Sequence, residues 1–447
     1  DWSQVAVHPV AEKLAEQERA LAAANAPLKD RSKGLPDGEE FSETKPYRKL
    51  PGIFHLHSWA PFYFNYDRIS ELSGDLTWRD AGVGATLLFQ NLLGTSDMTL
   101  GYSYHEDPYT TSWRHSGHAK LTWSGWFPVF EFSVDFNDRN ALNYNRIRQQ
   151  RVGEAAVSAV RGTLADGLGL QASLKTYVPL NFSRGGWNRG FVPQLQYTWS
   201  NDVVDKGLTV VTLPEEGSEA APDIEVTPGK KVRMQSLTAS VRGYVTRAKA
   251  SSQEYPRWGL GLEAGYRTRI GLDDLYSSAL YTYAYGYLPG LTRAQGLRLA
   301  ATWQHQNSAP NGENVITTRP RGFEDTTLST WLATHAQDQV KLSADYAVPF
   351  WVGDISWFSP LFYVTHFVIT PHADWLYFTG DRGGTGSGNL VSLGAEMTVR
   401  LANFLWLPYA TSVGLCLDWN GGGAYDRINP TTPLTRTYIG GVFSIDF

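Results

Sequence analysis

The sequence lacks the features that would place it in several large protein classes. Its 447 residues contain a single cysteine, Cys416, which excludes a disulfide-stapled scaffold. Lys and Arg number 39 against 44 Asp and Glu, so the excess of positive charge that nucleic-acid binding needs is missing. The best candidate for a long apolar run, Ala347 to Ile369, is broken by Pro349, Asp354 and Pro360, so no membrane-spanning helix of about 20 residues is expected.

Glycine and aromatic residues, by contrast, are abundant. The chain has 43 Gly, 16 Trp, 23 Tyr and 20 Phe, but only 3 Met. Aromatic side chains favour strands, and glycine suits the turns between them. This composition indicates many β-strands, each with one apolar face.

Apolar and polar residues alternate from about residue 52 to the end of the chain. Side chains on a strand point to opposite faces in turn, so each alternating segment has one apolar and one polar face. The clearest segments begin at Phe130, Leu168, Trp258, Val340 and Val391.

Two architectures fit such strands. A soluble sandwich or propeller would turn the apolar faces inward, whereas a transmembrane barrel would turn them outward to lipid. The segments run for about ten residues or more, which is the length a tilted strand needs to cross a bilayer. Aromatic residues lie near segment ends, as interfacial girdles require, and they include Trp123, Trp126, Trp258, Tyr281, Tyr283, Trp303, Trp375, Tyr377 and Trp419. We therefore expect an all-β fold, a transmembrane antiparallel β-barrel.

Seventeen segments qualify as candidate strands. Dropping the first, 53–66, because Pro61 and the triplet His55-Leu56-His57 interrupt it, leaves about 16 strands. The alternative keeps this segment and finds one more strand inside 201–230, giving about 18. The other candidates are 80–92, 97–106, 117–125, 128–137, 153–163, 168–180, 189–200, 231–247, 256–270, 275–287, 292–306, 337–349, 359–378, 388–402, 408–419 and 437–447.

The first fifty residues have a different texture. Good helix formers predict a helix over 9–25, and the polar, aperiodic stretch 26–50 predicts a linker. We expect residues 1–50 to form a short periplasmic helix and linker, and residues 51–447 to form the barrel. Because the sequence starts with Asp1 and shows no signal peptide, we expect either a processed product or a C-terminal fragment.

One connection, residues 307–336, carries a resemblance to a known family. Its Pro320-Arg321-Gly322-Phe323 resembles the Arg-Gly-Phe tip of the inward-folded loop in BamA-type barrels, a superfamily of outer-membrane insertases and two-partner secretion translocators. In that superfamily the loop precedes the twelfth of sixteen strands. Five candidate strands follow the loop here, which favours the count of 16 over 18.

The resemblance also implies an acidic partner for the loop tip. A lumen-facing acidic residue is expected on the second strand after the loop, and Asp374 occupies that place. A guanidinium can form two parallel hydrogen bonds to a carboxylate, and one partly buried ion pair would anchor a long loop that is costly to order. Gly322 would give backbone freedom at the tip, and Phe323 would wedge against the wall. We call Arg321, Gly322, Phe323 and Asp374 the loop-tip lock.

A weak seam between the first and last strands is a further implication of the resemblance. Gly440 and Gly441 would weaken hydrogen bonding and packing in the last strand, so that a client strand could pair with the exposed edge. The terminal Phe447 is also a feature of outer-membrane barrels. We therefore expect Gly440, Gly441 and Phe447 to belong to a lateral seam.

The chain departs from the superfamily at both ends. Fifty residues before the barrel cannot hold a POTRA domain, and Val442 stands where the terminal signal has glycine. Residues 47–62, YRKLPGIFHLHSWAPF, resemble the junction that precedes barrel domains of Bacteroidota proteins after a TolB-like propeller. That second resemblance implies that the chain is the C-terminal part of a longer product.

These patterns together suggest a function in the bacterial outer membrane. The leading hypothesis is insertion or translocation of outer-membrane or secreted proteins, within a multiprotein complex. The alternatives are a passive pore or uptake channel, and a structural barrel that anchors partner proteins. Expected partners are outer-membrane lipid and other envelope proteins, with no nucleic acid.

Neither an enzyme nor a metal site is expected. A hydrolase would need a nucleophile elbow, and no GxSxG accompanies the candidate set His115, Ser116, His118 and Ser124. Two histidines, His55 and His57, could share one strand face and bind a metal with His372 or Asp374, but no further spaced ligand supports this. We expect no catalytic residues, no metal and no cofactor, and we expect Cys416 to be a small filler on the lumen face.

Overall fold

The chain divides into two compact units, Asp1–Lys49 and Leu50–Phe447. The computed structural model describes residues 13–21, 55–64, 81–107, 110, 112–151, 157–214, 221–250, 252–307, 309–323, 326–356, 362–380, 386–404, 410–430 and 432–446. In the first unit, residues 13–21 are helical and fall inside the helix expected over 9–25. The rest of that expected helix and the linker 26–50 lie outside the described residues. No helix in the described part of the chain is long and apolar enough to cross a membrane.

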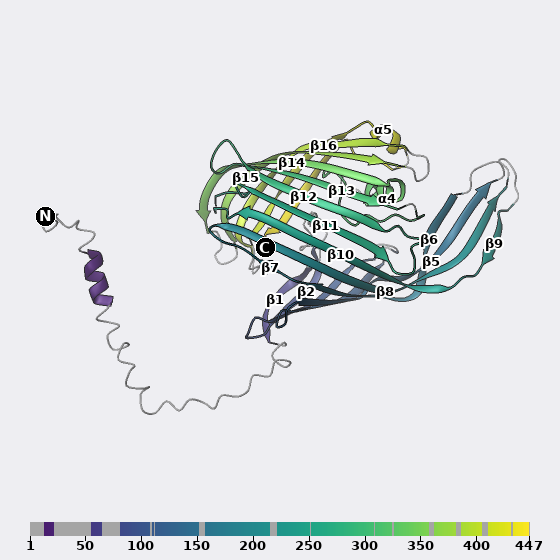
Figure 1. Cartoon of the computed structure of the whole chain (residues 1–447), viewed down its shortest axis with the longest axis horizontal. Helices are drawn as coiled ribbons and strands as arrows, with labels where there is room; N and C mark the ends of the chain where they lie inside the picture. Colours follow the sequence, from purple (N-terminus) through teal and green to yellow (C-terminus); the bar gives the residue numbers. More distant parts are fainter. Residues whose placement is uncertain are drawn as a thin grey trace, which may run out of the picture. The chain divides into compact units, whose positions relative to one another are not determined.

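The second unit is a transmembrane antiparallel β-barrel (Figure 1). Its sheet contains eighteen strands over the described residues, close to the expected number of about 16, and it includes both extra strands that the alternative of 18 required, the first candidate segment and one inside 201–230. Over the described residues, sixteen long strands each pair with the next one along the chain. Two short strands, β7 (Leu180–Asn181) and β9 (Asp223–Thr227), pair with β8 and fall outside that number. The long strands are β1 (Leu56–Phe64), β2 (Ala81–Gln90), β3 (Ser96–Glu106), β4 (Trp113–Trp123), β5 (Val129–Arg151), β6 (Val157–Tyr177), β8 (Trp187–Leu213), β10 (Lys231–Arg247), β11 (Gly259–Arg269), β12 (Ala279–Pro289), β13 (Gly296–Gln306), β14 (Asp338–Ile355), β15 (Phe362–Thr379), β16 (Gly388–Phe404), β17 (Ala410–Gly421) and β18 (Thr437–Asp446).

The sixteen long strands are not the same sixteen segments that the sequence predicted. The rejected first candidate is a strand, β1, and its ladder with β2 shifts register between Leu56 and Ser58 and again between Ala60 and Phe62, on either side of Pro61. Such irregularities admit a residue without an N–H, and an end strand of the array tolerates it best.

Two other candidate segments form a single strand, so the number of long strands is still sixteen. The candidates 153–163 and 168–180 are one strand, β6, so residues 164–167 between them continue the strand. Leu164 pairs with Leu142 while Leu168 pairs with Asn140, so β6 has extra residues opposite β5. The Asp-Gly signal at Gly167, where φ is 137°, therefore marks a bulge within a strand.

The preferred count of 16 places no strand inside 201–230, whereas the alternative of 18 places one there, and the structure has strands in this segment. β8 continues without a break to Leu213, and β9 returns beside it. In Figure 1, β5, β6, β8 and β9 run on together beyond their neighbours. We call the part formed by residues 142–151, 157–164, 203–213 and 223–227 the strand extension.

Burial along the barrel wall is the reverse of that in a soluble core. Apolar side chains are exposed, with Leu260 at 67% and Leu415 at 62%, whereas Gln304, Asp374 and Asn420 are at 1% or less. In the barrel, the exposed apolar faces meet lipid and the buried polar faces line the lumen. The alternating sequence pattern thus sets which face of every strand turns inward.

The two ends of the barrel differ in the length of their connections. The links 91–95 and 290–295 are short turns, and Gly94 has a φ of 63° that a tight turn requires. At the opposite end, the links 307–337 and 422–436 are long and contain helices α4 (Thr326–His335) and α5 (Tyr425–Ile428). We call these the turn end and the loop end, and residues 307–337 the long loop.

Candidate functional site

The long loop connects the eleventh and twelfth long strands, β13 and β14, and five strands, β14 to β18, follow it. This is the position that the resemblance implies. The loop folds against the lumen face of its own strands. Gln304 accepts a hydrogen bond from the Val315 N–H at 2.8 Å and donates one to the Glu313 carbonyl at 2.8 Å, and Gln306 accepts the Glu313 N–H at 2.8 Å.

Arg321, at the loop tip, binds Asp374 through three donors. Its backbone N–H and its Nε donate to Asp374 Oδ2 at 2.9 and 3.1 Å, and its Nη2 donates to Oδ1 at 3.1 Å. The guanidinium also pairs with Asp345, and its Nη1 lies 3.5 Å from Glu396. The structure therefore brings Arg321 and Asp374 together and adds two carboxylates that the sequence did not indicate.

Strand register explains why three carboxylates converge here. Asp345 on β14, Asp374 on β15 and Glu396 on β16 all occupy lumen-facing positions of adjacent strands. Asp345 and Asp374 are 2% and 1% exposed, so each needs a cation. Lys341 lies 3.8 Å from Asp374 and Arg298 lies 3.6 Å from Asp345, in addition to Arg321.

The charge of Arg321 is fixed by this environment. Burial alone would lower the pKa of Arg321, but the Asp374 and Asp345 carboxylates outweigh it and hold the pKa well above its ordinary value. The guanidinium therefore stays protonated at every accessible pH.

Gly322 is required for a reason other than the expected backbone freedom. Its N–H donates to Ser392 Oγ at 3.2 Å, and Asn420 Nδ2 donates to its carbonyl at 2.6 Å. A Cβ at this position would lie 2.2 Å from Asn420 Oδ1 and 2.4 Å from Ser392 Oγ. Glycine therefore permits a close approach of the loop backbone to β16 and β17.

Phe323 is 1% exposed and packs into a small apolar cluster that includes Leu376 and Phe378 of β15 and Leu390 of β16, residues of the barrel wall. The ring centroid lies 6.3 Å from that of Tyr425 in α5. This cluster joins the long loop to its neighbour at the loop end. Its members are Phe323, Leu328, Trp331, Leu332, Ala336, Leu376, Phe378, Leu390, Ala424, Tyr425, Ile428 and Leu434.

A buried histidine supports the same strands. His372 Nε2 lies 2.5 Å from Asp418 Oδ1, and Ser392 Oγ donates to the same oxygen at 3.4 Å. Asp418 lies two residues before Asn420 on β17, on the same face of the strand. The contact between His372 and Asp418 therefore helps to position Asn420, whose side chain donates to the Gly322 carbonyl. Sequence reasoning missed Asp345, Ser392, Glu396, Asp418 and Asn420 as partners, although the alternating pattern places each on the lumen face.

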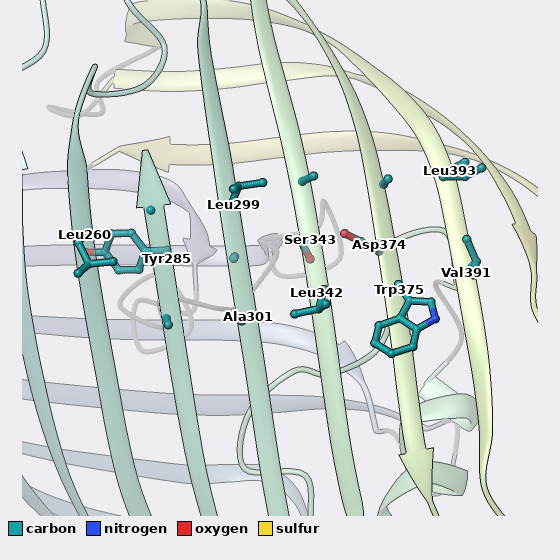
Figure 2. Close-up of a pocket in the computed structure, with 15 residues that line it drawn as sticks. Leu260, Tyr285, Leu299, Ala301, Leu342, Ser343, Asp374, Trp375, Val391 and Leu393 are labelled. Carbon is teal, nitrogen blue, oxygen red and sulfur yellow. The ribbon is translucent and has the colours of Figure 1, made fainter. Parts of the chain in front are cut away.

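The wall behind the lock is hollowed on its outer side. A cavity of about 660 Å³ lies over β11 to β16, with small residues such as Ala301, Ala344 and Ala373 among its lining. Figure 2 shows Leu260, Leu299, Leu342, Trp375 and Leu393 around it. Asp374 also lines this hollow, so a single layer of sheet separates the lock from the lipid side.

At the turn end, the connection between β10 and β11 contacts lumen-facing side chains of other strands. Glu254, in the turn between β10 and β11, accepts a hydrogen bond from Arg400 Nε on β16 at 3.0 Å and lies 3.5 Å from His366 Nε2 on β15. Burial alone would raise the pKa of Glu254, but the neighbouring His366 and the charge of Arg400 lower it to about 2. This turn is therefore anchored to strands five places further along the barrel.

The predicted seam residues lie apart from the lock. Gly440 and Gly441 are on β18, opposite Cys416 and Leu415 of β17, and Phe447 lies outside the described residues. Nothing lies within 4 Å of a Cβ built on Gly441, whereas the nearest atoms to one built on Gly440 belong to the Tyr438 side chain, with the hydroxyl oxygen at 2.0 Å. Cys416 is 9% exposed between outward-facing leucines, on the lumen face as expected.

One arrangement in the lumen has the bonding order of an acyl-transfer triad. Ser103 Oγ lies 3.1 Å from His118 Nε2, and His118 Nδ1 lies 2.7 Å from Asp135 Oδ1. Ser103 is 2% exposed, and the Tyr63 ring stacks on His118 with the ring centroids 4.1 Å apart. Within the described ranges, no group of three or more His, Cys, Asp or Glu side chains could hold a metal ion.

Comparisons with solved structures find similar chains at low sequence identity. The chain is similar to CdiB from Escherichia coli with a TM-score of 0.46 and 10% identity, over 84% of this chain and 61% of that one. It is similar to CdiB from Acinetobacter baumannii with a TM-score of 0.39 and 10% identity, over 82% and 56%. The matches thus span less than two thirds of either CdiB chain. No protein-family model and no curated protein matches the sequence.

Proposed function

We propose that the chain is a translocator barrel of the bacterial outer membrane, acting without enzymatic chemistry in the insertion or secretion of other proteins. In this proposal the loop-tip lock braces the lumen, and the seam between β1 and β18 opens to a client strand. Other envelope proteins and outer-membrane lipid are the expected partners. The observation that carries the proposal is the grip of three carboxylates on Arg321 at the tip of the long loop.

The long loop supports a translocator over a passive pore. Its backbone is held to β13 by glutamine side chains, and its tip reaches β15, β16 and β17. Ordering a loop of this length costs entropy, which these contacts to four strands must offset. An ordered loop inside the lumen suits a barrel that must stay sealed until a client arrives.

The end strands support the seam. β1 has nine residues, two register shifts and Pro61, which cannot donate to a ladder. On β18, Gly440 and Gly441 contribute no side chains to cross-strand packing. Over the described residues no ladder joins β1 to β18, so an incoming strand could add to the edge of either strand.

Disulfide cross-linking tests the seam. In a Cys416→Ser background, Trp59→Cys or Pro61→Cys is combined with Ile439→Cys or Gly441→Cys. The seam-locked proteins should lose assembly of a reporter barrel in proteoliposomes and regain it on reduction. The matched control, Met397→Cys with Leu415→Cys, joins a fixed pair on β16 and β17 and should retain activity when oxidised. Full activity of the oxidised seam pair would overturn the mechanism.

Planar-bilayer recording and copurification address the alternatives. A large, steady current through the purified barrel would favour a pore or uptake channel, whereas the proposal expects little current from wild-type protein. Copurification from native membranes should recover envelope proteins. A barrel that neither conducts nor assembles clients, but retains such proteins, would favour an anchoring role.

A further inference from the structure

The strand extension has no role in crossing the membrane. A tilted transmembrane strand needs about 9–11 residues, and β5, β6 and β8 have 23, 21 and 27. Beyond the barrel, β6 pairs antiparallel with β5, β5 pairs parallel with β8, and β8 pairs antiparallel with β9. The extra length thus forms a four-stranded sheet at the loop end, with the order β6, β5, β8, β9.

The base of this sheet is firmly held. Arg139 Nη1 donates to Asp202 Oδ1 at 2.9 Å, its Nη2 contacts Oδ2 at 2.5 Å, and the Leu142 N–H donates to Oδ1 at 2.9 Å. Val204, at 0% exposure, packs with Tyr276 and other residues of the loop between β11 and β12. A sheet anchored in this way presents its outer edge in a defined orientation.

The outer edge is β9. Within the described residues, its ladder is with β8 on one side, and all five of its residues are exposed. Ile224 and Val226 are 60% and 64% exposed. An exposed edge strand is a template for a further strand, because backbone groups on its free side can pair with another chain.

The side chains of β9 indicate what such a strand would carry. Asp223 and Glu225 lie on one face, and Ile224 and Val226 lie on the other. Neither acid takes part in an ion pair among the described residues. An antiparallel pair of two β9 strands centred on Glu225 would place like charges directly opposite each other, which is unfavourable. The charges therefore disfavour self-association and favour a basic partner strand.

We propose that the β9 edge binds an extended segment of another protein, in which Lys or Arg alternates with apolar residues. The basic residues would lie opposite Asp223 and Glu225, and the apolar ones opposite Ile224 and Val226. Backbone hydrogen bonds give the affinity, and the alternation gives the register. This surface lies outside the lumen and the seam, so the proposal does not depend on how clients cross the membrane.

Peptide binding to the full chain in nanodiscs tests the proposal. Fluorescence anisotropy compares a peptide of alternating Lys and Val with a peptide of alternating Glu and Val, and with one that groups the same Lys and Val residues in blocks. The alternating basic peptide should bind best. In the variant Asp223→Lys with Glu225→Lys, affinity for it should fall by about tenfold and the acidic peptide should become preferred.

Two controls separate strand addition from simple charge attraction. Asp273→Lys with Asp426→Lys changes the net charge by the same amount on other loop-end elements and should leave binding unchanged. N-methylation of one alternate set of peptide amides should abolish binding, while methylation of the other set should be tolerated. Equal binding of the alternating and block peptides, or equal loss with both methylation sets, would overturn the proposal.

Discussion

Arg321 donates to the Asp374 carboxylate from both its backbone N–H and its guanidinium group. One carboxylate thus fixes the path of the loop backbone and the direction of the side chain at its tip. Asp345 and Glu396 share the same guanidinium, so four charged groups from the long loop and three consecutive strands form one unit. Substitutions in this unit should act jointly and not as independent pairs.

Arg321→Ala should be more damaging than Asp374→Asn. Removal of the arginine leaves three carboxylates around an empty site, two of them buried, whereas removal of the Asp374 charge leaves Arg321 with Asp345 and Glu396. Breaking a buried pair in this way costs about 3–5 kcal/mol. Urea unfolding in detergent, followed by heat-modifiable migration on gels, measures the difference. Equal destabilisation by the two variants would show that Asp345 and Glu396 contribute little.

Charge reversal gives the matching cycle. Arg321→Glu should destabilise the long loop, and adding Asp374→Arg should restore part of the loss. The restoration should be incomplete, because the introduced glutamate would still face Asp345 and Glu396, while the introduced arginine would face Lys341. A double-mutant cycle with no coupling between positions 321 and 374 would contradict the pairing.

Gly322→Ala should destabilise the loop tip through a steric clash. The new Cβ would lie 2.2 Å from Asn420 Oδ1, and relief of this contact is expected to cost about 1–3 kcal/mol. Gly441→Ala is the matched control, since a Cβ there meets nothing within 4 Å. Limited proteolysis of the long loop reports the outcome. If Asn420→Ala fails to relieve part of the Gly322→Ala defect, the close approach is not its cause.

The sequence was sufficient to predict which face of each strand turns inward, but not which side chains form pairs in the lumen. Alternation places Asp345, Asp374 and Glu396 on the inner face without any structure. Which of them meet at one level depends on the stagger between β14, β15 and β16, and each register is set by contacts along the whole ladder. Arg321 and Asp374 were paired by resemblance, whereas the other two carboxylates had no such guide.

The predicted strand boundaries were wrong where proline or glycine suggested a break but the hydrogen bonds to the neighbouring strand continued. Pro61 and Asp166-Gly167 are strong signals for a break or a turn, yet one lies within β1 and the other at a bulge within β6. Both irregularities are tolerated because the neighbouring strand continues past them. The length of β8 could not be predicted either, because nothing in its sequence marks where the barrel ends and the strand extension begins.

Acid should release the turn that holds Glu254. The folded-state pKa of about 2 is below the ordinary value of 4.5, so the stabilisation is fully present above pH 4.5. It is lost as the pH falls from 4.5 towards 2, because the carboxylate then takes up a proton. Thermal unfolding of wild type and Glu254→Gln should therefore differ at pH 7 and converge near pH 2. A difference that stays constant over this range would exclude the ion pair with Arg400 as its source.

Shortening the long loop should open the lumen. Replacing residues 312–330 by a short Gly-Ser linker removes the three lock residues of the loop and half of α4, while both flanking strands keep their ladders. Planar-bilayer conductance should rise several-fold over wild type. A matched deletion of residues 209–226, which shortens the strand extension outside the barrel, should leave the conductance unchanged. If the two deletions conduct equally, the long loop does not seal the barrel, and the brace assigned to Arg321 would concern only the stability of the strands around it.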